Sequence, residues 1–521
     1  MARSAGKGER PMEEDLDTET LEITEDDAAF IMGKGGKTKA KLMRVSQCEI
    51  DLLDGELVLE FTGTSQQRRR AMRYAKCVMA QRVGSVTIND QDLEEDCTVV
   101  SVPQEATGFV TGRGGNFLRT LEDENGTLMF FADQDGVERH EEFVDLMIFG
   151  ERPGRRAAQL AVMSAIENKL PGNFSEEWRK TGATFESKAD LVGDWGTSTT
   201  ELSQPELSYA IGAHGKTRKK LGRASGCVVQ YVGNVVFMSG TKRQREHAKD
   251  YLKWLLDRLE GSMVIDTNRR DDVTVLEVPM DCVGYVTGRS RETLGLVEET
   301  FGTLMFFLGY KTEGHETEKL AIFGPLRARI GAKLMVMSAV ERKTKGYFTQ
   351  DLADEKTKTK GFDTDRLTLD PEDMAYASGK EGSTRKKIAA ASGAYLEFVG
   401  HMAFIAGDEK ERRRCRDYLG WLLEQKDGEL STDIRSRTDV TEVDISEEDI
   451  SWLLGSGLGE MRQIEQESHT FCCVMHGDDG MPRILICGHE EGTVHSETGR
   501  LKAERLFKNL MREHARGGGG G

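Results

Sequence analysis

A glycine-rich tetrad surrounded by lysines, Gly33-Lys34-Gly35-Gly36, is the stretch of this sequence best suited to hold an anion. Glycine has no Cβ atom, so a ligand can approach its backbone closely. The residues that follow, Lys37–Arg44, favour a helix, whose first N–H groups and positive dipole end would point back at the tetrad. Lys37 and Lys41 add positive charge, and no acidic residue interrupts them. The stretch therefore predicts a site for a phosphate backbone.

The tetrad position recurs along the chain, which indicates an internal repeat. The intervals between copies are alternately shorter and longer, so three duplicated pairs are the simplest account. Copies with a basic helix alternate with copies that share a strand such as GTLMFF. The first glycines of the five further copies are Gly112, Gly212, Gly288, Gly379 and Gly455.

Each copy predicts the same order of elements. A β-branched strand such as Val273–Val278 precedes a short helix that ends at the tetrad, and a second helix of about ten residues follows. Two strands come next, for example Val228–Val232 and Val235–Met238, joined by a tight turn at Gly233-Asn234. A long helix closes the copy. Trp254, like Trp421 in a later copy, shares helical spacing with Tyr and Leu, so both are expected in the core rather than as base-stacking platforms.

The order strand, helix, helix, strand, strand, helix, with G-x-x-G between the first two helices, resembles the KH domain in its eukaryotic, type I arrangement. Four intact tetrads in the same register carry this resemblance, which covers roughly residues 20–515. The chain is similar in general style to vigilin-like and poly(C)-binding-like proteins. The resemblance implies an α+β fold of six tandem KH domains, each with a three-stranded antiparallel sheet packed on three helices. These domains would be arranged as three two-domain modules.

The resemblance also divides the chain. Polar, poorly periodic segments at 171–197 and 346–364 are expected to be linkers, residues 1–19 a disordered tail, and residues 516–521 a glycine tail. The six domains are expected at residues 20–84, 97–170, 198–261, 272–345, 365–427 and 438–515.

In a KH domain the G-x-x-G loop clamps the backbone of about four nucleotides, and the bases face an apolar groove. The groove edges in this chain would include Ile50, Leu52, Val228–Gln230, Leu396 and Phe398. The implied nucleic-acid-binding residues are Gly33, Lys34, Gly35, Gly36, Lys37 and Lys41 in the first domain, Gly112, Arg113, Gly114 and Gly115 in the second, Gly212, Ala213, His214, Gly215, Lys216 and Lys219 in the third, and Gly379, Lys380, Glu381, Gly382, Arg385 and Lys386 in the fifth.

The even-numbered domains depart from this pattern. The second keeps its tetrad but has an acidic helix, Glu122-Asp123-Glu124. The fourth reads Gly288-Arg289-Ser290-Arg291, and the sixth, Gly455-Ser456-Gly457-Leu458, lacks the last glycine. In the fifth, Glu381 stands where a phosphate should approach. We therefore expect the odd domains to bind RNA, and the even domains to pack, to set spacing or to contact protein partners.

Composition and alternative motifs limit the function further. The net charge of −18 means that phosphate contacts must come from local basic patches. Gly36-Lys37-Thr38 and Gly215-Lys216-Thr217 resemble the end of a nucleotide-binding P-loop, but the glycine required five residues earlier is absent in both. A zinc site could be suggested by the group Cys472, Cys473, His476, Cys487 and His489, but repeat alignment places these cysteines on core strands. No catalytic arrangement recurs, so neither an enzyme, a metal nor a cofactor is expected.

The sequence also predicts where in the cell the protein is located. No run approaches eighteen apolar residues, and the charged N-terminus has no secretory pattern. Nine scattered cysteines suit a reducing compartment, in the cytoplasm or the nucleus. The sequence thus predicts a non-catalytic protein that binds single-stranded RNA in post-transcriptional regulation. Single-stranded DNA binding and a protein-interaction scaffold are the alternatives.

Overall fold

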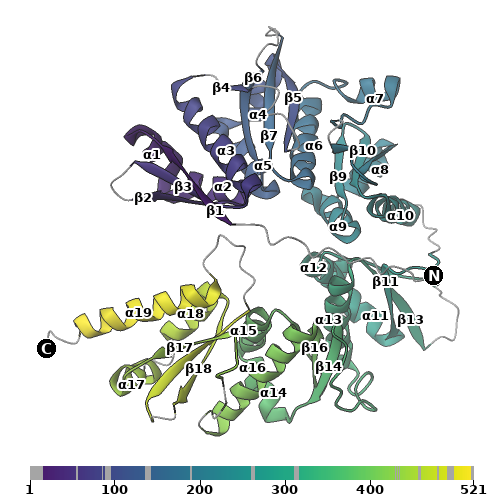
Figure 1. The fold of residues 1–521 in the computed structure, drawn as a ribbon. Coiled ribbons are helices and arrows are strands. Elements are labelled where there is room, and N and C mark those ends of the chain that lie inside the picture. Colours follow the sequence, from purple (N-terminus) through teal and green to yellow (C-terminus); the bar gives the residue numbers. More distant parts are fainter. Residues whose placement is uncertain are drawn as a thin grey trace, which may run out of the picture. The chain divides into compact units, whose positions relative to one another are not determined.

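The computed structural model divides the chain into two compact units, each with three copies of one α+β fold (Figure 1). The first unit comprises residues 1–222 and 226–259, and the second comprises 223–225 and 260–521. This grouping in threes differs from the three pairs expected from the spacing. The structure describes residues 16–53, 57–84, 86–88, 96–134, 142–187, 190–259, 265–309, 316–428, 430, 432, 434–455, 459–477, 480–489 and 498–517.

The first domain shows the fold that all six share. Its sheet has the strand order β1-β3-β2 and is antiparallel throughout, with Ile50 opposite Phe61 in the register. Three helices cover one face of the sheet and bury Ile31, Leu42 and Tyr74. The expected order of elements and sheet is confirmed. The elements are β1 (Asp17–Glu22), α1 (Glu25–Met32), α2 (Lys37–Ser46), β2 (Glu49–Leu53), β3 (Val58–Gly63) and α3 (Ser65–Val83).

The other two domains of the first unit repeat this order. The second has β5 (Cys97–Pro103), α4 (Gln104–Thr111), α5 (Asn116–Asn125), β6 (Leu128–Gln134), β7 (Phe143–Phe149) and α6 (Arg152–Lys169). The third has β8 (Gly196–Glu201), α8 (Gln204–Ile211), α9 (Lys216–Ser225), β9 (Val228–Val232), β10 (Val235–Gly240) and α10 (Lys242–Leu259).

The second unit holds the remaining three domains. The fourth has β11 (Val273–Pro279), α11 (Met280–Thr287), α12 (Glu292–Phe301), β12 (Leu304–Phe307), β13 (Thr317–Phe323) and α13 (Leu326–Lys343). The fifth has β14 (Asp363–Thr368), α14 (Pro371–Ser378), α15 (Ser383–Ser392), β15 (Tyr395–Val399), β16 (Met402–Gly407) and α16 (Glu409–Asp427). The sixth has β17 (Val440–Asp444), α17 (Glu447–Gly455), α18 (Gly459–Ser468), β18 (Phe471–His476), β19 (Pro482–Cys487) and α19 (Gly499–Gly517).

Local sequence signals set the ends of these helices. Thr24 and Asp27 form a reciprocal capping box at the start of α1, as Asp408 and Glu411 do for α16. Gly226 ends α9 in the left-handed conformation, which glycine adopts without a steric penalty.

Neighbouring domains within a unit share buried cores. In the sheet of the second domain, Leu146 and Ile148 pack under that domain's own helices. Met147 and Phe149 lie in the core of the first domain, where the Phe149 ring is 5.3 Å from that of Tyr74 on α3. Both faces of this sheet are therefore buried, which explains its unbroken apolar run.

Other junctions follow the same plan, with the last helix of one domain against the sheet of the next. Leu160 and Met163 of α6 pack with Val235 and Phe237 of the third domain. In the second unit, α13 packs with β16 of the fifth domain. Residues of α16, including Tyr418, Trp421 and Leu422, pack with Phe471 and Cys473 of the sixth domain.

The connections between domains contain more structure than their composition indicates. The sheet of the second domain has four strands and not the expected three, because β4 (Val86–Ile88) pairs in parallel with β6.

The segment 171–197 contains helix α7 (Ser175–Thr181), and Trp178 packs on the third domain. In the segment 346–364, Phe348 and Leu352 pack against the core of the fourth and fifth domains. The described parts of both segments thus pack against neighbouring domains, although their composition is polar.

Most residues at the two chain ends are not among the described residues. Residues 1–15 and 518–521, expected as tails, lie outside the described residues, and α19 extends through Gly517. Among the described helices, none has the length and apolar character needed to cross a membrane.

Candidate nucleic-acid interface

The backbone of the tetrad is the same in the first five domains. In the first, Gly33, Gly35 and Gly36 have φ values of 62°, 63° and 76°. The residues at these three positions also have positive φ in the second to fifth domains, including the non-glycine residues His214 and Glu381. Each loop turns directly into the second helix, so the N–H groups at the helix start face the loop. In the sixth domain, residues 456–458 of the tetrad lie outside the described residues.

The first glycine of each loop is required by packing. A Cβ atom on Gly33 would lie 2.2 Å from Thr38 Oγ1, and one on Gly379 would lie 2.3 Å from Thr384 Oγ1. A Cβ atom on Gly35 would meet nothing within 4 Å. The inner positions therefore tolerate a side chain at the cost of a left-handed conformation.

This tolerance explains the fourth domain. Ser290 and Arg291 adopt φ values of 50° and 64°, so the loop keeps its shape without the inner glycines. Arg291 turns inward and donates to Glu298 and to the Met305 carbonyl, both at 3.0 Å. Arg289 stays exposed. Of the two arginines that could have met a phosphate, only Arg289 is therefore available.

The predicted cations differ in what they contact. Exposed side chains surround the loops at Lys34 and Lys37, at Arg113, at Ala213, His214, Lys216 and Lys219, and at Lys380 and Lys386. Glu381, the acidic residue of the fifth loop, is exposed as well. Lys219 lies 4.0 Å from Glu124 of the second domain, with more than half of each side chain exposed. Such a pair contributes little energy and leaves Lys219 able to meet another anion.

One cation in each odd domain lies over the second strand of its sheet. Lys39 contacts Asp51 at 2.6 Å, and Arg218 donates to the Val229 carbonyl at 3.2 Å. Arg385 donates to the Leu396 carbonyl and to Glu397, both at 2.7 Å. Burial raises the pKa of the Glu397 carboxyl, although Arg385 acts in the opposite direction. The groove beside each odd loop is therefore polar at this point, not wholly apolar.

Lys41, which was expected among the nucleic-acid-binding residues, contacts the neighbouring domain. Its Nζ atom lies 2.6 Å from Glu122 Oε2 of the second domain, and Glu122 is only 3% exposed. In the second unit, Lys387 contacts Glu465 in the same way, at 2.8 Å. Both lysines connect an odd domain to the even domain that follows it.

The groove edge also needs correction. Ile50 is fully buried, and Leu396 is 2% exposed, so both belong to the domain cores. Val228 packs against the cluster that joins the second and third domains. Leu52, Gln230 and Phe398 are half-buried and stay within reach of a ligand. Ile50 and Leu52 are two residues apart and share one face of their strand, as Leu396 and Phe398 do, so burial changes along the strand and not between its faces.

Six aromatic residues at one position of the repeat were missed by the sequence reasoning. Each lies three residues before the first glycine of its tetrad, one helical turn away. Phe109 is 53% exposed and Tyr285 is 48% exposed. The constant spacing is a signal visible in the sequence. The six residues are Phe30, Phe109, Tyr209, Tyr285, Tyr376 and Trp452.

One of these aromatic residues lines a cleft within the first unit. The cleft has a volume of about 310 Å³ and is lined by Phe109 and Phe117 of the second domain. Arg218 and residues 228–230 of the third domain form the facing wall. An exposed ring and a cation thus face the same space, an arrangement suited to a base and its phosphate.

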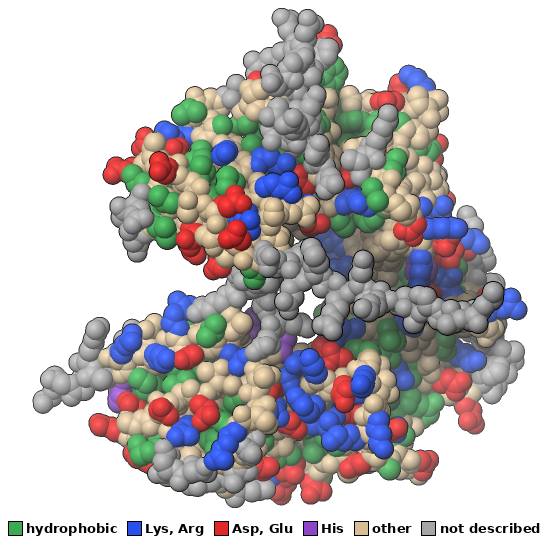
Figure 2. All heavy atoms as spheres, in the orientation of Figure 1, with side chains coloured by type: hydrophobic (Ala, Val, Ile, Leu, Met, Phe, Trp, Pro, Cys, Tyr) green, Lys and Arg blue, Asp and Glu red, His purple; other side chains and the backbone are tan. Residues whose placement is uncertain are grey.

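Charge is distributed locally over the surface. On the visible face, basic and acidic side chains alternate in small groups and form no single basic surface (Figure 2). This pattern agrees with a chain that is acidic overall and has basic loops.

The tryptophans and cysteines considered for other roles lie in the core. Trp254 and Trp421 are 7% and 6% exposed, as expected for core positions. Cys472 packs in the sixth domain, whereas Cys473 faces the fifth. Their side chains therefore enter different clusters, which does not suit a shared zinc ion.

The fold and the loop define a class of protein. Residues 18–76, the first domain, match the family model of the KH domain. With six copies of this fold and the same loop in the five that are described, the chain is a multi-KH-domain protein, in the class of nucleic-acid-binding proteins.

Two curated human proteins are similar over part of the chain. Far upstream element-binding protein 1 of Homo sapiens is 22% identical over 257 residues, which cover 47% of this chain and 38% of that protein. Far upstream element-binding protein 2 of Homo sapiens is 20% identical over 261 residues, 47% of this chain and 35% of that protein. The matched part is thus less than two fifths of the length of either relative.

Similarity to solved structures is weak. Dim2p from Pyrococcus horikoshii OT3 is 18% identical, with a TM-score of 0.18, over 30% of this chain and 89% of that chain. A structure described as "KH domains" is 10% identical, with a TM-score of 0.12, over 68% of this chain and 93% of that chain. Superpositions at this level support no conclusion by themselves.

Proposed function

We propose that this protein binds single-stranded RNA, without catalysis, through the loops of its odd-numbered domains. The observation that carries the proposal is the shared left-handed loop with exposed cations, Lys34 and Lys37 in the first domain and Lys380 in the fifth. Backbone N–H groups and lysines together suit a phosphate chain. Binding to messenger RNA in post-transcriptional regulation, in the cytoplasm or nucleus, is the role proposed for this activity.

The exposed aromatic residues before the loops, such as Phe30 and Tyr376, extend the proposed site from phosphate to base, whereas the Trp452 ring of the sixth domain already stacks on His514. A ring one helical turn from the clamp is placed for a base to stack on it, and stacking accepts any base. Each loop would then hold a short piece of strand. Several linked sites raise the overall affinity through effective concentration.

Single-stranded DNA is the second candidate, since a phosphate clamp and a stacking ring do not depend on the 2′-hydroxyl. The scaffold alternative is less favoured by the contacts. The acidic helix of the second domain faces Lys41 and Arg44 of the first, at 2.6 and 3.2 Å, and so has a partner inside the chain.

Fluorescence anisotropy of the full chain with a labelled polyuridylate oligonucleotide tests the proposal. The full chain is needed because neighbouring domains share cores. Replacing Lys34 and Gly35 by Asp, and Ala213 and His214 by Asp, should weaken binding strongly through repulsion of phosphate. Unchanged affinity after both replacements would contradict the proposal. Competition with oligodeoxyuridylate then distinguishes RNA from DNA.

A further inference from the structure

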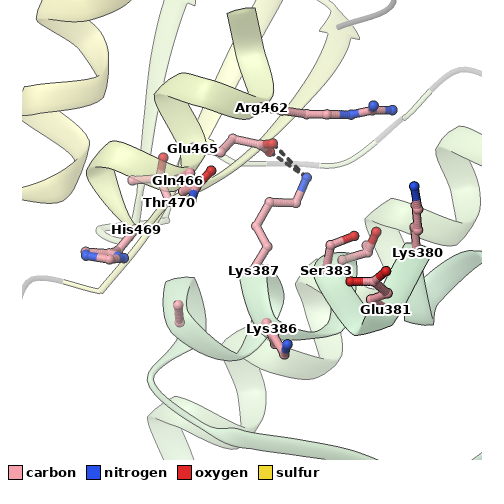
Figure 3. A pocket seen from close by; sticks show the side chains of 12 residues that line it. Lys380, Glu381, Ser383, Lys386, Lys387, Arg462, Glu465, Gln466, His469 and Thr470 are labelled. Carbon is pink, nitrogen blue, oxygen red and sulfur yellow. Dashed lines mark hydrogen bonds and ion pairs between the residues drawn. The ribbon is translucent and has the colours of Figure 1, made fainter. Parts of the chain in front are cut away.

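A cleft of about 600 Å³ lies between the fifth and sixth domains, inside the second unit. The loop and helix α15 of the fifth domain form one wall, with Lys380, Glu381 and Lys386. Helix α18 of the sixth domain forms the other wall, with Arg462 and Gln466 (Figure 3). The cleft therefore begins at a nucleic-acid-binding loop and extends to a domain whose own tetrad lacks its last glycine.

An ion pair closes the bottom of this cleft. Lys387 reaches across from α15 and lies 2.8 Å from both carboxylate oxygens of Glu465 (Figure 3). Glu465 also accepts a hydrogen bond from the Cys472 amide at 2.8 Å. These contacts hold the two walls together, and their charges cancel.

The remaining cations of the cleft are exposed. Lys380, Lys386 and Arg462 are all exposed, and none has an ion-pair partner among the described residues. Glu381 is the one carboxylate besides the paired Glu465 among the residues that line the cleft. The cleft is therefore locally positive in a chain with a net charge of −18.

A comparison with the first two domains shows an ion pair that this cleft lacks. Arg44 and Asp123, each eleven residues after the first glycine of its tetrad, form an ion pair of 3.2 Å between those domains. The same positions in the fifth and sixth domains are Ala390 and Gln466, and both line the cleft. The fifth and sixth domains therefore have no ion pair at these positions, and an alanine and a glutamine side chain face the cleft instead.

We propose that this cleft binds a phosphate of the nucleic-acid strand that crosses the loop of the fifth domain. Arg462 would form an ion pair with the phosphate, and the Gln466 amide would donate to it, a combination typical of phosphate recognition. The sixth domain then contributes through its second helix and not through a loop of its own. This inference rests on the proposed function, because it requires a strand on the fifth loop.

The test uses the full chain with the first and third loops disabled by K34D, G35D, A213D and H214D. Anisotropy with labelled polyuridylate then reports mainly on the second unit. Arg462→Glu and Gln466→Glu should each weaken binding about tenfold, since a charge-assisted contact is lost. Arg462→Glu should also reduce the slope of the logarithm of the binding constant against the logarithm of the salt concentration by about one, the value for one phosphate contact. Gln463→Glu, at an exposed position on the same helix but outside the cleft, is the matched control and should change little.

A second variant leaves the total charge unchanged. Ala390→Arg combined with Gln466→Asp restores the ion pair of the first two domains and should close the cleft, which would weaken binding about as much as Arg462→Glu. Ala390→Arg alone should maintain or strengthen binding. Circular dichroism checks that each variant is folded.

The outcomes separate the two proposals. If the disabled chain binds but Arg462→Glu and the restored pair behave like Gln463→Glu, the cleft inference is overturned and the proposed function stands. If the unmodified chain binds and the disabled chain does not, the cleft inference is overturned as well. If the unmodified chain does not bind polyuridylate or oligodeoxyuridylate, both proposals fail.

Discussion

Lys41 of the first domain donates a hydrogen bond of 2.6 Å to Glu122 of the second, a carboxylate that is only 3% exposed. Glu122 also accepts the Met129 amide at 2.8 Å. Lys387 and Glu465 repeat this relationship in the second unit. The middle of this basic helix thus joins the next domain, whereas its first turn lies beside the tetrad that is proposed to bind nucleic acid. The spacing between neighbouring domains is therefore held by the same helix that follows the clamp.

Removing this cation should loosen the domain junction. Lys41→Met leaves the Glu122 carboxylate buried without its ion-pair partner, at a cost of about 1–2 kcal/mol because Lys41 is partly exposed to solvent. Hydrogen exchange of the full chain should then be faster in β6, where Met129 depends on Glu122. Lys37→Met, at an exposed position of the same helix, is the control. Equal exchange in both variants would show that the pair has no structural role.

The two glycine positions of the first loop should respond differently to alanine. Gly33→Ala places a methyl group 2.2 Å from Thr38 Oγ1 and forces the loop to move. Gly35→Ala has open space and costs about 1 kcal/mol for the left-handed conformation. In anisotropy titrations of a chain with A213D and H214D in the third loop and K380D in the fifth, we expect Gly33→Ala to abolish most binding and Gly35→Ala to retain it. The reverse order would mean that the inner glycine approaches the ligand too closely for any side chain.

The sequence was sufficient to predict the repeated fold, because each element has a local signal. The tetrad, the Gly233-Asn234 turn and the helical spacing of Tyr251 and Trp254 depend only on residues near one another. The even domains were expected to pack or to set spacing, but the surfaces that join neighbouring domains were not predicted, although the apolar run Leu146–Phe149 contains their signal. An unbroken apolar strand needs cover on both faces, and only the structure shows that α3 supplies the second cover.

The candidate site was predicted in part for a related reason. The loop residues were identified from spacing, but the lysines after them were treated as equivalent. Helical geometry places Lys37 and Lys41 on one side, yet the neighbouring domain meets only Lys41. That distinction depends on Glu122, which is far away in sequence and becomes a neighbour only through folding. The aromatic residue before each glycine was visible in the sequence and was overlooked.

The cysteine side chains should be unreactive in the native protein. All nine cysteines are buried, and none is in a disulfide in the structure. Burial raises the pKa of the Cys48 thiol to about 11 and that of Cys415 to about 12. Since the thiolate is the reactive form, iodoacetamide at about pH 8 should label these residues only after denaturation, and native labelling should increase only as the pH approaches these values. Rapid labelling of Cys48 in the native chain at about pH 8 would contradict its buried position.

The exposed ring before the fifth loop should contribute stacking energy. Tyr376 is 43% exposed and lies three residues before Gly379. Tyr376→Ala should weaken polyuridylate binding about tenfold in a chain with the first and third loops disabled, because stacking on an aromatic ring contributes roughly 1–3 kcal/mol per base. Tyr376→Phe keeps the ring and should bind as the unmodified residue does. Equal loss in both variants would indicate a hydrogen bond from the hydroxyl group instead of stacking.

Glu381 should limit the affinity of the fifth loop in two separable ways. Its backbone is left-handed, with φ of 54°, and its carboxylate is exposed at the position where a phosphate would approach. Glu381→Gln removes the charge and keeps the strained conformation, so binding should strengthen severalfold, with a smaller gain at high salt, where charges are screened. Glu381→Gly removes the charge and also relieves about 1 kcal/mol of strain, so it should raise thermal stability as well. Anisotropy titrations at two salt concentrations, together with thermal unfolding of the same chains, measure both effects. A carboxylate that instead binds a ligand amino group would show the opposite result, with weaker binding in both variants.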